Sequence, residues 1–204
     1  MQITAMEPRR KSFVQLYIDG EAAVKIDKET LLKSGLRNGD ELTDEQLHEL
    51  LQQSDERRAH EKALYLLEHR SHSRKELEDK IARTAASREA AKAAAEHMEE
   101  IGLVDDGQFA RDFARMLFER KQYGARRVRQ ELLQKGIDRE IIAEILEEYA
   151  EEDSTEIIRG ILTRKYPAFA EDEKIRRRAV AALQRFGYGF DEIKAAMRDW
   201  DEEA

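Results

Sequence analysis

Residues 105–137 read DDGQFARDFARMLFERKQYGARRVRQELLQKGI, and this stretch combines two helix patterns with the densest positive charge of the chain. Asp105 and Gln108 have the spacing of a capping box, which predicts a helix that begins near residue 106. Gly124 breaks the apolar periodicity of this helix, and a second helix follows. Gly136 suits the left-handed position that ends a helix. The stretch therefore predicts two helices joined by a short turn.

The same stretch is basic, although the 204-residue chain carries a formal net charge of -8. Between Gly107 and Gly136, eight basic side chains face three acidic ones, a local excess of five positive charges. Such an island can neutralise phosphates or meet an acidic protein surface. The alternative is a solvated helical face that pairs with its own neighbouring acids, which is the more common role of a charge run. The basic residues are Arg111, Arg115, Arg120, Lys121, Arg126, Arg127, Arg129 and Lys135.

Two of these arginines have little acidic company. We expect Arg126 and Arg127 on the outer face of the second helix, opposite the inward-facing Val128 and Leu132, with Glu131 as the one acid nearby. A second basic cluster lies nearer the C-terminus, at Arg176, Arg177 and Arg178. Together with the residues of the first island, these are the candidates for contacting DNA or a partner protein.

The composition favours a helix-rich protein and excludes several kinds of site. Charged residues make up 39% of the chain and aromatic residues 7%, with two prolines, while the apolar positions stay periodic, unlike those of a disordered chain. The absence of cysteine excludes disulfides, thiolate metal sites and cysteine nucleophiles. The first residues lack a signal-peptide core, and no run approaches the roughly 20 apolar residues of a membrane span. We expect a cytoplasmic protein with no membrane partner.

Residues 1–55 predict a small α+β unit that is too small for a large core and packs on the helical part of the chain after it. Its pattern comprises a strand at Phe13–Ile18, an Asp19-Gly20 hairpin turn, a return strand over Ala22, Val24 and Ile26, and a short strand at Ile3–Met6 that could pair with either. Asp27 caps a short helix that Gly35 ends. A capping box of Thr43 and Gln46 begins another helix.

From about residue 55 onward the sequence predicts helices only, and they repeat every 51 residues. Three sets of positions correspond at this offset: Leu77, Val128 and Ala179; Ile81, Leu132 and Leu183; Ala91, Ile142 and Ile193. A fixed period of this size indicates a repeat array whose units bury their faces on their neighbours. The predicted helices are 57–70, 74–84 and 88–101, then 106–121, 125–135 and 139–151, then 154–165, 172–186 and 190–200. The corresponding domains are 1–55, 56–105, 106–153 and 154–204.

Motifs for catalysis or cofactor binding are absent. The chain has neither a GxxxxGK[ST] phosphate loop nor a GxGxxG, so we expect no nucleotide cofactor. His69 and His72 lack a nearby third ligand, and we interpret them as solvated histidines at a helix end rather than a metal site. Tyr123 could stack on a base, but packing under the loop between helices is the stronger interpretation. Trp200 is predicted to cap the core of the array. We therefore expect no enzyme, no cofactor and no metal.

A family resemblance rests on the middle of the chain. The Gly102-Leu103-Val104-Asp105-Asp106 element with Phe109-Ala110, followed by Gly124-Ala125-Arg126-Arg127-Val128-Arg129-Gln130-Glu131-Leu132 and Lys135-Gly136-Ile137, resembles the RecX family of bacterial recombination regulators. The resemblance covers about residue 55 to the end, and the N-terminal unit is similar to an extension found in some members. It implies a mainly α fold of three tandem three-helix repeats in an elongated curved array, here preceded by the small β-hairpin and helix unit.

The resemblance also implies a function. Family members bind the RecA recombinase in its nucleoprotein filament on single-stranded DNA and modulate it, usually by inhibiting its ATPase, strand-exchange and coprotease activities in homologous recombination, DNA repair and the SOS response. Some members also bind DNA. The family pattern implies Arg126, Arg127, Arg129 and Lys135 as contact residues and supplies no catalytic residue. We expect a monomer. The alternatives are a direct DNA-binding helical protein, single- or double-stranded, and a general helical-repeat interaction scaffold.

Overall fold

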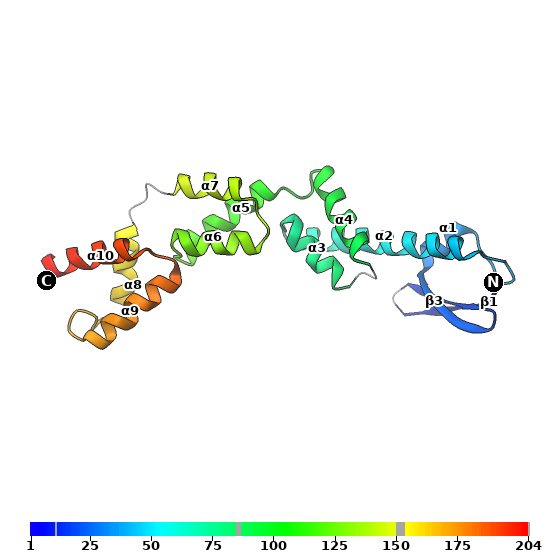
Figure 1. Ribbon diagram of the computed structural model, residues 1–204, viewed down its shortest axis with the longest axis horizontal. Helices are drawn as coiled ribbons and strands as arrows, with labels where there is room; N and C mark the ends of the chain where they lie inside the picture. Colours follow the sequence, from blue (N-terminus) through cyan, green and yellow to red (C-terminus); the bar gives the residue numbers. More distant parts are fainter. Residues whose placement is uncertain (11, 85–86, 150–153, 204) are drawn as a thin grey trace. The chain divides into compact units, whose positions relative to one another are not determined.

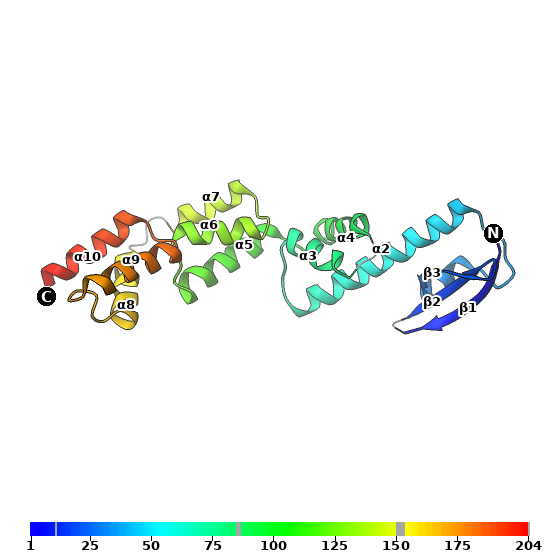
Figure 2. The ribbon, with the colours of Figure 1, turned by 60° about the horizontal axis from the view of Figure 1, so that its bottom comes forward.

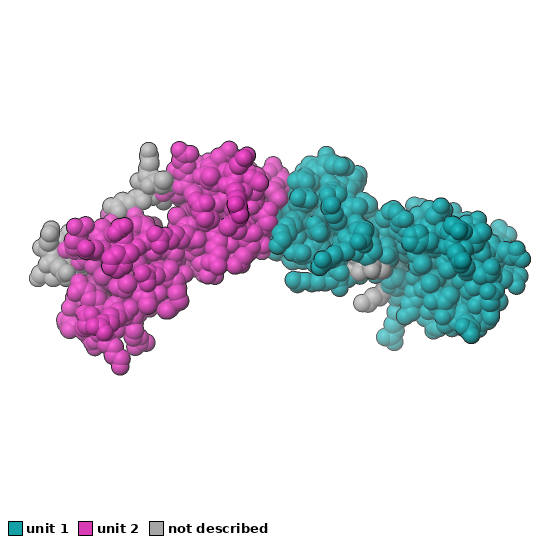
Figure 3. All heavy atoms as spheres, viewed as in Figure 1, with its two compact units in different colours: residues 1–104 teal, residues 105–204 magenta. Residues whose placement is uncertain are grey.

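The structure is a computed structural model that describes residues 1–10, 12–84, 87–149 and 154–203, with the side chains of 199–203 excepted. The chain divides into two compact units, Met1–Val104 and Asp105–Ala204 (Figure 3). The described residues contain ten α-helices and one three-stranded sheet, which confirms the mainly α class with a small N-terminal sheet. The side chain of Trp200 lies outside the described residues.

The sheet of the first unit is antiparallel, with the order β1-β2-β3 (Figure 2). Its strands are β1 (Ile3–Arg9), β2 (Phe13–Ile18) and β3 (Glu21–Asp27). Asp19 and Gly20 have φ angles of 51° and 89°, as a two-residue turn between twisted strands requires. The predicted hairpin is confirmed, and the strand whose partner the sequence left open pairs with β2.

Two helices follow the sheet. Helix α1 (Lys28–Ser34) begins where the Asp27 carboxylate accepts a hydrogen bond from the amide of Thr30, and it ends at Gly35 with φ of 71°. Helix α2 (Asp44–His69) begins with the predicted capping box of Thr43 and Gln46. The sequence predicted two helices here, the second over 57–70, and this was wrong. Residues 44–69 contain no glycine, proline or β-branched side chain, so nothing interrupts the helix.

The N-terminal sheet packs on α2, as expected for a unit with a small core. Val14, Leu16 and Ile26 of the sheet join Leu31 of α1 and Leu50 of α2 in one buried cluster. A polar contact fixes the same interface, because the buried Asp27 carboxylate lies 3.0 Å from Nε of Arg57. The amide of Asp27 also donates to the hydroxyl oxygen of Ser54 at 2.9 Å.

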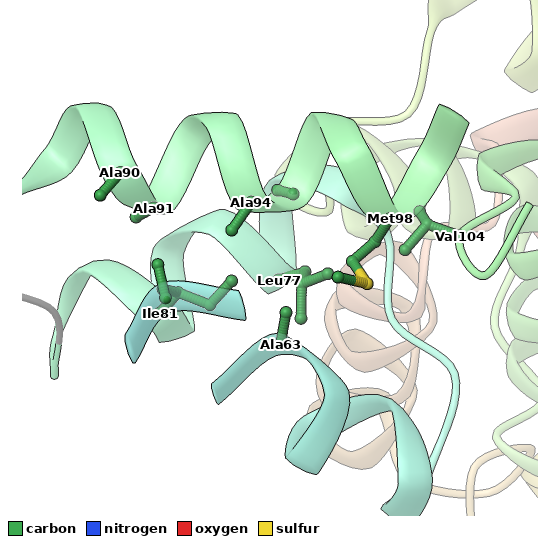
Figure 4. Packing of buried hydrophobic residues seen from close by; sticks show 10 residues of the cluster. Ala63, Leu77, Ile81, Ala90, Ala91, Ala94, Met98 and Val104 are labelled. Atoms are coloured by element: carbon green, nitrogen blue, oxygen red, sulfur yellow. The ribbon is translucent and has the colours of Figure 1, made fainter. Parts of the chain in front are cut away.

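Alanine dominates the core between α2, α3 (Arg74–Ala82) and α4 (Arg88–Glu100). Ala90, Ala91 and Ala94 of α4 turn toward Leu77 and Ile81 of α3 in Figure 4, which also shows the small side chain of Ala63 on α2. Such side chains let helix backbones approach closely, so this three-helix unit closes over few bulky residues.

Within its described residues, the second unit contains six α-helices, labelled in Figure 1, and a π-helical turn. They are α5 (Asp106–Arg115), the π-helical turn Met116–Arg120, α6 (Ala125–Gln134), α7 (Arg139–Glu148), α8 (Ser154–Lys165), α9 (Glu173–Phe186) and α10 (Phe190–Glu203). The first three α-helices and the turn enclose one core, and α8 to α10 enclose another. The prediction carried the third helix of the middle repeat to residue 151, and residues 150–153 lie outside the described part of the chain.

The 51-residue period is confirmed by burial. Ile81, Leu132 and Leu183 are all completely buried, and so are Leu77, Val128 and Ala179. Ala91, Ile142 and Ile193 form a third buried set. Equivalent positions therefore face the core of each three-helix group, which is how a repeated apolar pattern becomes a repeated packing unit.

Candidate interface for phosphates or an acidic partner

Helix α5 holds the first pair of predicted contact residues. The Asp105 carboxylate accepts a hydrogen bond from the amide of Gln108 at 2.8 Å, which begins the helix where the sequence predicted. The Gln108 side chain bonds to Asp112 instead of turning back, so half of the expected capping box forms. Arg111 and Arg115 follow four residues apart, a spacing that places both on one face of the helix, and both are exposed.

A π-helical turn carries the chain from α5 toward α6. The amide of Lys121 donates to the carbonyl oxygen of Met116 at 3.2 Å, five residues earlier. Gln122 then adopts a φ of 53°, which is uncommon for a residue other than glycine. The following repeat fixes this residue, because Arg164 donates to its side-chain oxygen at 2.6 Å and the Tyr188 hydroxyl donates to its carbonyl oxygen at 3.0 Å. Arg120 and Lys121 thus stand next to a well-anchored backbone.

The start of α6 abuts the turn between α9 and α10. The amide of Gly124 donates to the carbonyl oxygen of Phe186 at 2.8 Å, and the amide of Arg126 donates to that of Gly187 at 3.3 Å. A Cβ on Gly124 would lie 2.6 Å from the carbonyl carbon and oxygen of Gly187. Glycine at this position therefore does more than break a helical pattern, because it permits a backbone-to-backbone contact between repeats.

The first turn of α6 is electrostatically positive. It contains no acidic residue, and it carries Arg126 and Arg127. The amides at a helix N-terminus add roughly half a positive charge, which falls off within the first turn. Carbonyl oxygens of Phe186 and Gly187 already cover this helix end, so the attraction of an anion rests on the arginine charges.

Five of the predicted residues are exposed and available. Within the described part of the chain, none of the five forms an ion pair. Arg115 instead lies 3.9 Å from Asp112 in an exposed pair, which contributes little to stability and is easily broken. The five available residues, which we call the α5–α6 basic residues, are Arg111, Arg120, Lys121, Arg126 and Arg129.

Arg127 is less available than the other predicted contact residue in the first turn of α6. Its side chain is 37% exposed, and it pairs with Glu131 at 2.5 Å. The guanidinium also lies 5.7 Å from the centre of the Tyr123 ring, which itself packs beside Phe186. Arg127 thus belongs to the junction between repeats, and Tyr123 packs under the loop as the stronger interpretation held. The pair with Glu131 follows from the helical pattern of α6, but the close approach of Gly187 to Arg127 could not be predicted, because Gly187 lies in the turn after α9.

The remaining candidates differ in environment. Lys135 is half-buried, with its ammonium 5.5 Å from the centre of the Phe113 ring. On α9, Arg176 is half-buried, Arg177 pairs with Glu173 at 3.0 Å, and Arg178 is exposed. Consecutive helical residues point about 100° apart, so these three arginines fan around α9 and do not share one face.

The basic residues at the equivalent junction of the first repeat pair with nearby acids. Arg70 bonds to both carboxylate oxygens of Glu76, at 3.0 and 2.9 Å. Arg74 lies 3.3 Å from Glu99, and Lys75 lies 3.8 Å from Asp79. The basic residues at the corresponding junction are therefore neutralised locally, unlike the α5–α6 basic residues.

One buried polar residue escaped the sequence analysis. His72 was expected in solvent beside His69, but its side chain is 3% exposed, whereas His69 is exposed as expected. Its Nδ1 lies 2.9 Å from the carbonyl oxygen of Arg70, and its Nε2 lies 3.0 Å from the ammonium of Lys80. Burial, together with the nearby Arg70 and Lys80 charges, lowers the pKa of His72. Among the described residues, no group of three or more candidate ligands could hold a metal ion.

The sequence was compared with known protein families and with individual relatives. The family model described as "RecX, second three-helix domain" matches residues 105–146, the part that carries the α5–α6 basic residues. A regulatory protein RecX from Caldanaerobacter subterraneus subsp. tengcongensis is 32% identical over 199 residues, which covers 97% of this chain and 98% of the relative. The chain belongs to the RecX family. The RecX protein of Chlorobium phaeobacteroides is 35% identical over 138 residues, covering 68% of this chain and 89% of the relative.

Solved RecX structures share the fold. A crystal structure of regulatory protein RecX superposes with a TM-score of 0.64 at 20% identity, covering 95% of this chain and 98% of the other. RecX from Lactobacillus salivarius gives a TM-score of 0.61 at 20% identity, covering 72% of this chain and 97% of the other. RecX is a family of regulatory proteins and not a known enzyme family. None of the helices in the described ranges is both long and apolar enough to cross a bilayer.

Proposed function

We propose that this chain binds the RecA recombinase filament on single-stranded DNA and inhibits its ATPase, strand-exchange and coprotease activities. The observation that carries the proposal is a coincidence of position. The α5–α6 basic residues, exposed and without internal ion pairs, lie within the segment that matches the RecX family model. A nucleoprotein filament presents both phosphates and protein carboxylates, and these are the groups that such residues bind.

The lack of internal partners matters for the free energy of binding. An arginine already paired with a carboxylate must exchange one partner for another, and the net gain is small. Arg111, Arg126 and Arg129 have no such pair to break in the described structure. Each can engage phosphate or carboxylate oxygens with two parallel hydrogen bonds, which lysine cannot do.

The test is the RecA ATPase on single-stranded DNA, titrated with this protein. We expect the rate to fall as the protein is added, and we expect Arg126→Glu with Arg129→Glu to need at least about tenfold more protein for the same inhibition. The matched control is Arg185→Glu, an exposed arginine on α9 outside both basic clusters. A double variant that is folded and inhibits at the wild-type concentration would contradict the assignment of the contact surface.

The two alternatives are separated in the same experiment. A direct DNA-binding protein binds a labelled oligonucleotide without RecA, and the logarithm of its affinity falls with the logarithm of salt concentration. A general interaction scaffold leaves the RecA ATPase unchanged at every concentration. A filament regulator requires RecA for its effect and loses potency when the α5–α6 basic residues are reversed.

A further inference from the structure

A groove that none of the α5–α6 basic residues lines lies between α9 and α10, which lie side by side in both ribbon views (Figures 1 and 2). It has a volume of about 480 Å³ and is mostly apolar. Helix α9 contributes Val180 and Ala181, and α10 contributes Phe190 and Met197. Phe190 is 57% exposed, one of the most exposed large apolar side chains of the described residues. The groove thus presents apolar surface that nothing in the described chain covers.

The same groove carries an excess of positive charge. Arg176 and Arg177 line it from α9, and Lys194 and Arg198 line it from α10. Among the described side chains one acid, Glu173, also lines it, so these residues carry a formal excess of three positive charges on a chain whose net charge is -8. Lys194 and Arg198 are four residues apart, which places them on one face of α10 as a pair of exposed charges.

The groove has the length of a short helix. Its lining residues on α9 run from Glu173 to Gln184, which at 1.5 Å per residue is about 16 Å, or three helical turns. A helix that lies in a groove presents apolar anchors at i, i+3 or i+4, and i+7, a spacing that matches this length. Acidic residues beside those anchors would meet the basic side chains.

We propose that the α9–α10 groove is a docking site for an acidic amphipathic helix of a partner protein. Phe190 is the one aromatic side chain among the described residues that line the groove, and bases bind by stacking, so this apolar lining favours a protein segment over nucleic acid. The charge excess selects an acidic segment over a basic one. The proposal does not depend on RecA binding, because the groove and its charges are independent of the α5–α6 basic residues.

Two synthetic peptides of about 14 residues test the proposal. Both carry leucine at i, i+3, i+4 and i+7, and the remaining positions are mainly glutamate in one peptide and mainly lysine in the other. Fluorescence anisotropy with the full chain at low salt should give a dissociation constant of about 1–100 μM for the acidic peptide. The basic peptide should bind at least about tenfold more weakly.

Substitutions in the groove supply the controls. Ala181→Glu places a charge on the apolar lining at an exposed helical position where glutamate is tolerated, and it should weaken the acidic peptide at least about tenfold. The matched control, Ala93→Glu at an exposed position of α4, should bind like wild type. Lys194→Glu with Arg198→Glu leaves two basic side chains against three acidic ones and should reverse the preference toward the basic peptide.

Several outcomes would overturn the proposal. The proposal is wrong if the acidic peptide does not bind the full chain at a concentration of about 1 mM. It is also wrong if the acidic peptide binds the Ala181→Glu variant as tightly as it binds the wild type. If a single-stranded oligonucleotide displaces the labelled peptide more effectively than unlabelled peptide does, the groove is assigned to nucleic acid. A dimer in sedimentation that Ala181→Glu dissociates would assign it to a second copy of this chain. Because Arg126→Glu should leave peptide binding unchanged, failure here and failure of the RecA proposal can be told apart.

Discussion

Gly124 and Gly187 contact each other through their backbones, so that a Cβ on Gly124 would lie 2.6 Å from the carbonyl carbon and oxygen of Gly187. The amide of Gly124 and the carbonyl oxygen of Phe186 form a hydrogen bond in the same contact, at 2.8 Å. Gly187 itself adopts a φ of 98°, which side chains disfavour. This contact ties the start of α6 to the end of α9, and it therefore holds the positive first turn of α6 in place.

Gly124→Ala should destabilise the second unit by about 1–3 kcal/mol, because the added methyl group forces two backbone segments apart. Urea unfolding, followed by circular dichroism, measures the change. Gly160→Ala is the matched control: a Cβ there meets nothing within 4 Å, and the position is inside α8. It should stabilise the protein by about 0.4–1 kcal/mol, so equal effects from the two substitutions would argue against a tight contact.

Leu132→Ala should cost about 2–5 kcal/mol, because Leu132 is completely buried in the core of α5 to α7 and the substitution leaves a cavity. Gln130→Ala, on the exposed face of the same helix, should change the unfolding free energy by less than about 0.5 kcal/mol. Thermal or urea melts of the two variants provide the comparison. A small cost at Leu132 would mean that the core of the middle repeat is loosely packed.

The stability of the first unit should fall as the pH drops below about 6.5, the usual pKa of histidine. The folded state lowers the pKa of His72, so the unfolded chain takes up a proton more readily as the pH falls. The contribution is complete above the unfolded pKa and declines as the pH falls toward the folded value. Urea melts at several pH values should show that the unfolding free energy falls more steeply toward acid pH in the wild type than in His72→Gln. Parallel curves would show that His72 titrates equally in both states.

Local signals made most of the fold predictable. The Asp27 and Thr43 caps, the Asp19-Gly20 turn and the 51-residue period depend on residues near in sequence or on repetition, and all appear in the structure. The π-helical turn and the burial of His72 could not be predicted in this way. After the turn, Gln122 depends on Arg164 and Tyr188, which are distant in the chain. His72 contacts Arg70 and Lys80 nearby in the sequence, but no local pattern marks it as buried.

The position of the candidate interface could be predicted from the sequence, but which of its arginines are available for binding could not. The excess of positive charge in residues 105–137 is visible in the sequence, and the structure leaves five of its residues exposed without internal pairs. Neighbouring arginines nevertheless differ, because Arg127 faces Glu131 and Tyr123 while Arg126 faces solvent. The i,i+4 pair with Glu131 and the packing of the next repeat, at the turn after α9, together distinguish Arg127 from Arg126.

This difference yields a prediction that separates stability from binding. Arg127→Ala should destabilise the protein by about 1 kcal/mol, because it removes an i,i+4 ion pair with Glu131 and a cation–π contact with Tyr123. Arg126→Ala should change stability by less than about 0.5 kcal/mol, because its side chain is exposed and forms no ion pair within the described residues.

For inhibition of RecA, we expect Arg126→Ala to have the larger effect and Arg127→Ala the smaller one. Arg126→Ala should raise the concentration that half-inhibits the RecA ATPase, and if its partner is a phosphate, the log–log salt slope of binding should decrease by about one unit. Arg127→Ala should leave that slope unchanged once its loss of stability is taken into account. Titrations at two or more salt concentrations, with urea melts of the same protein preparations, measure both quantities. If the two substitutions change the salt slope equally and the unfolding free energy equally, Arg126 and Arg127 act together. The distinction drawn from their contacts would then be wrong.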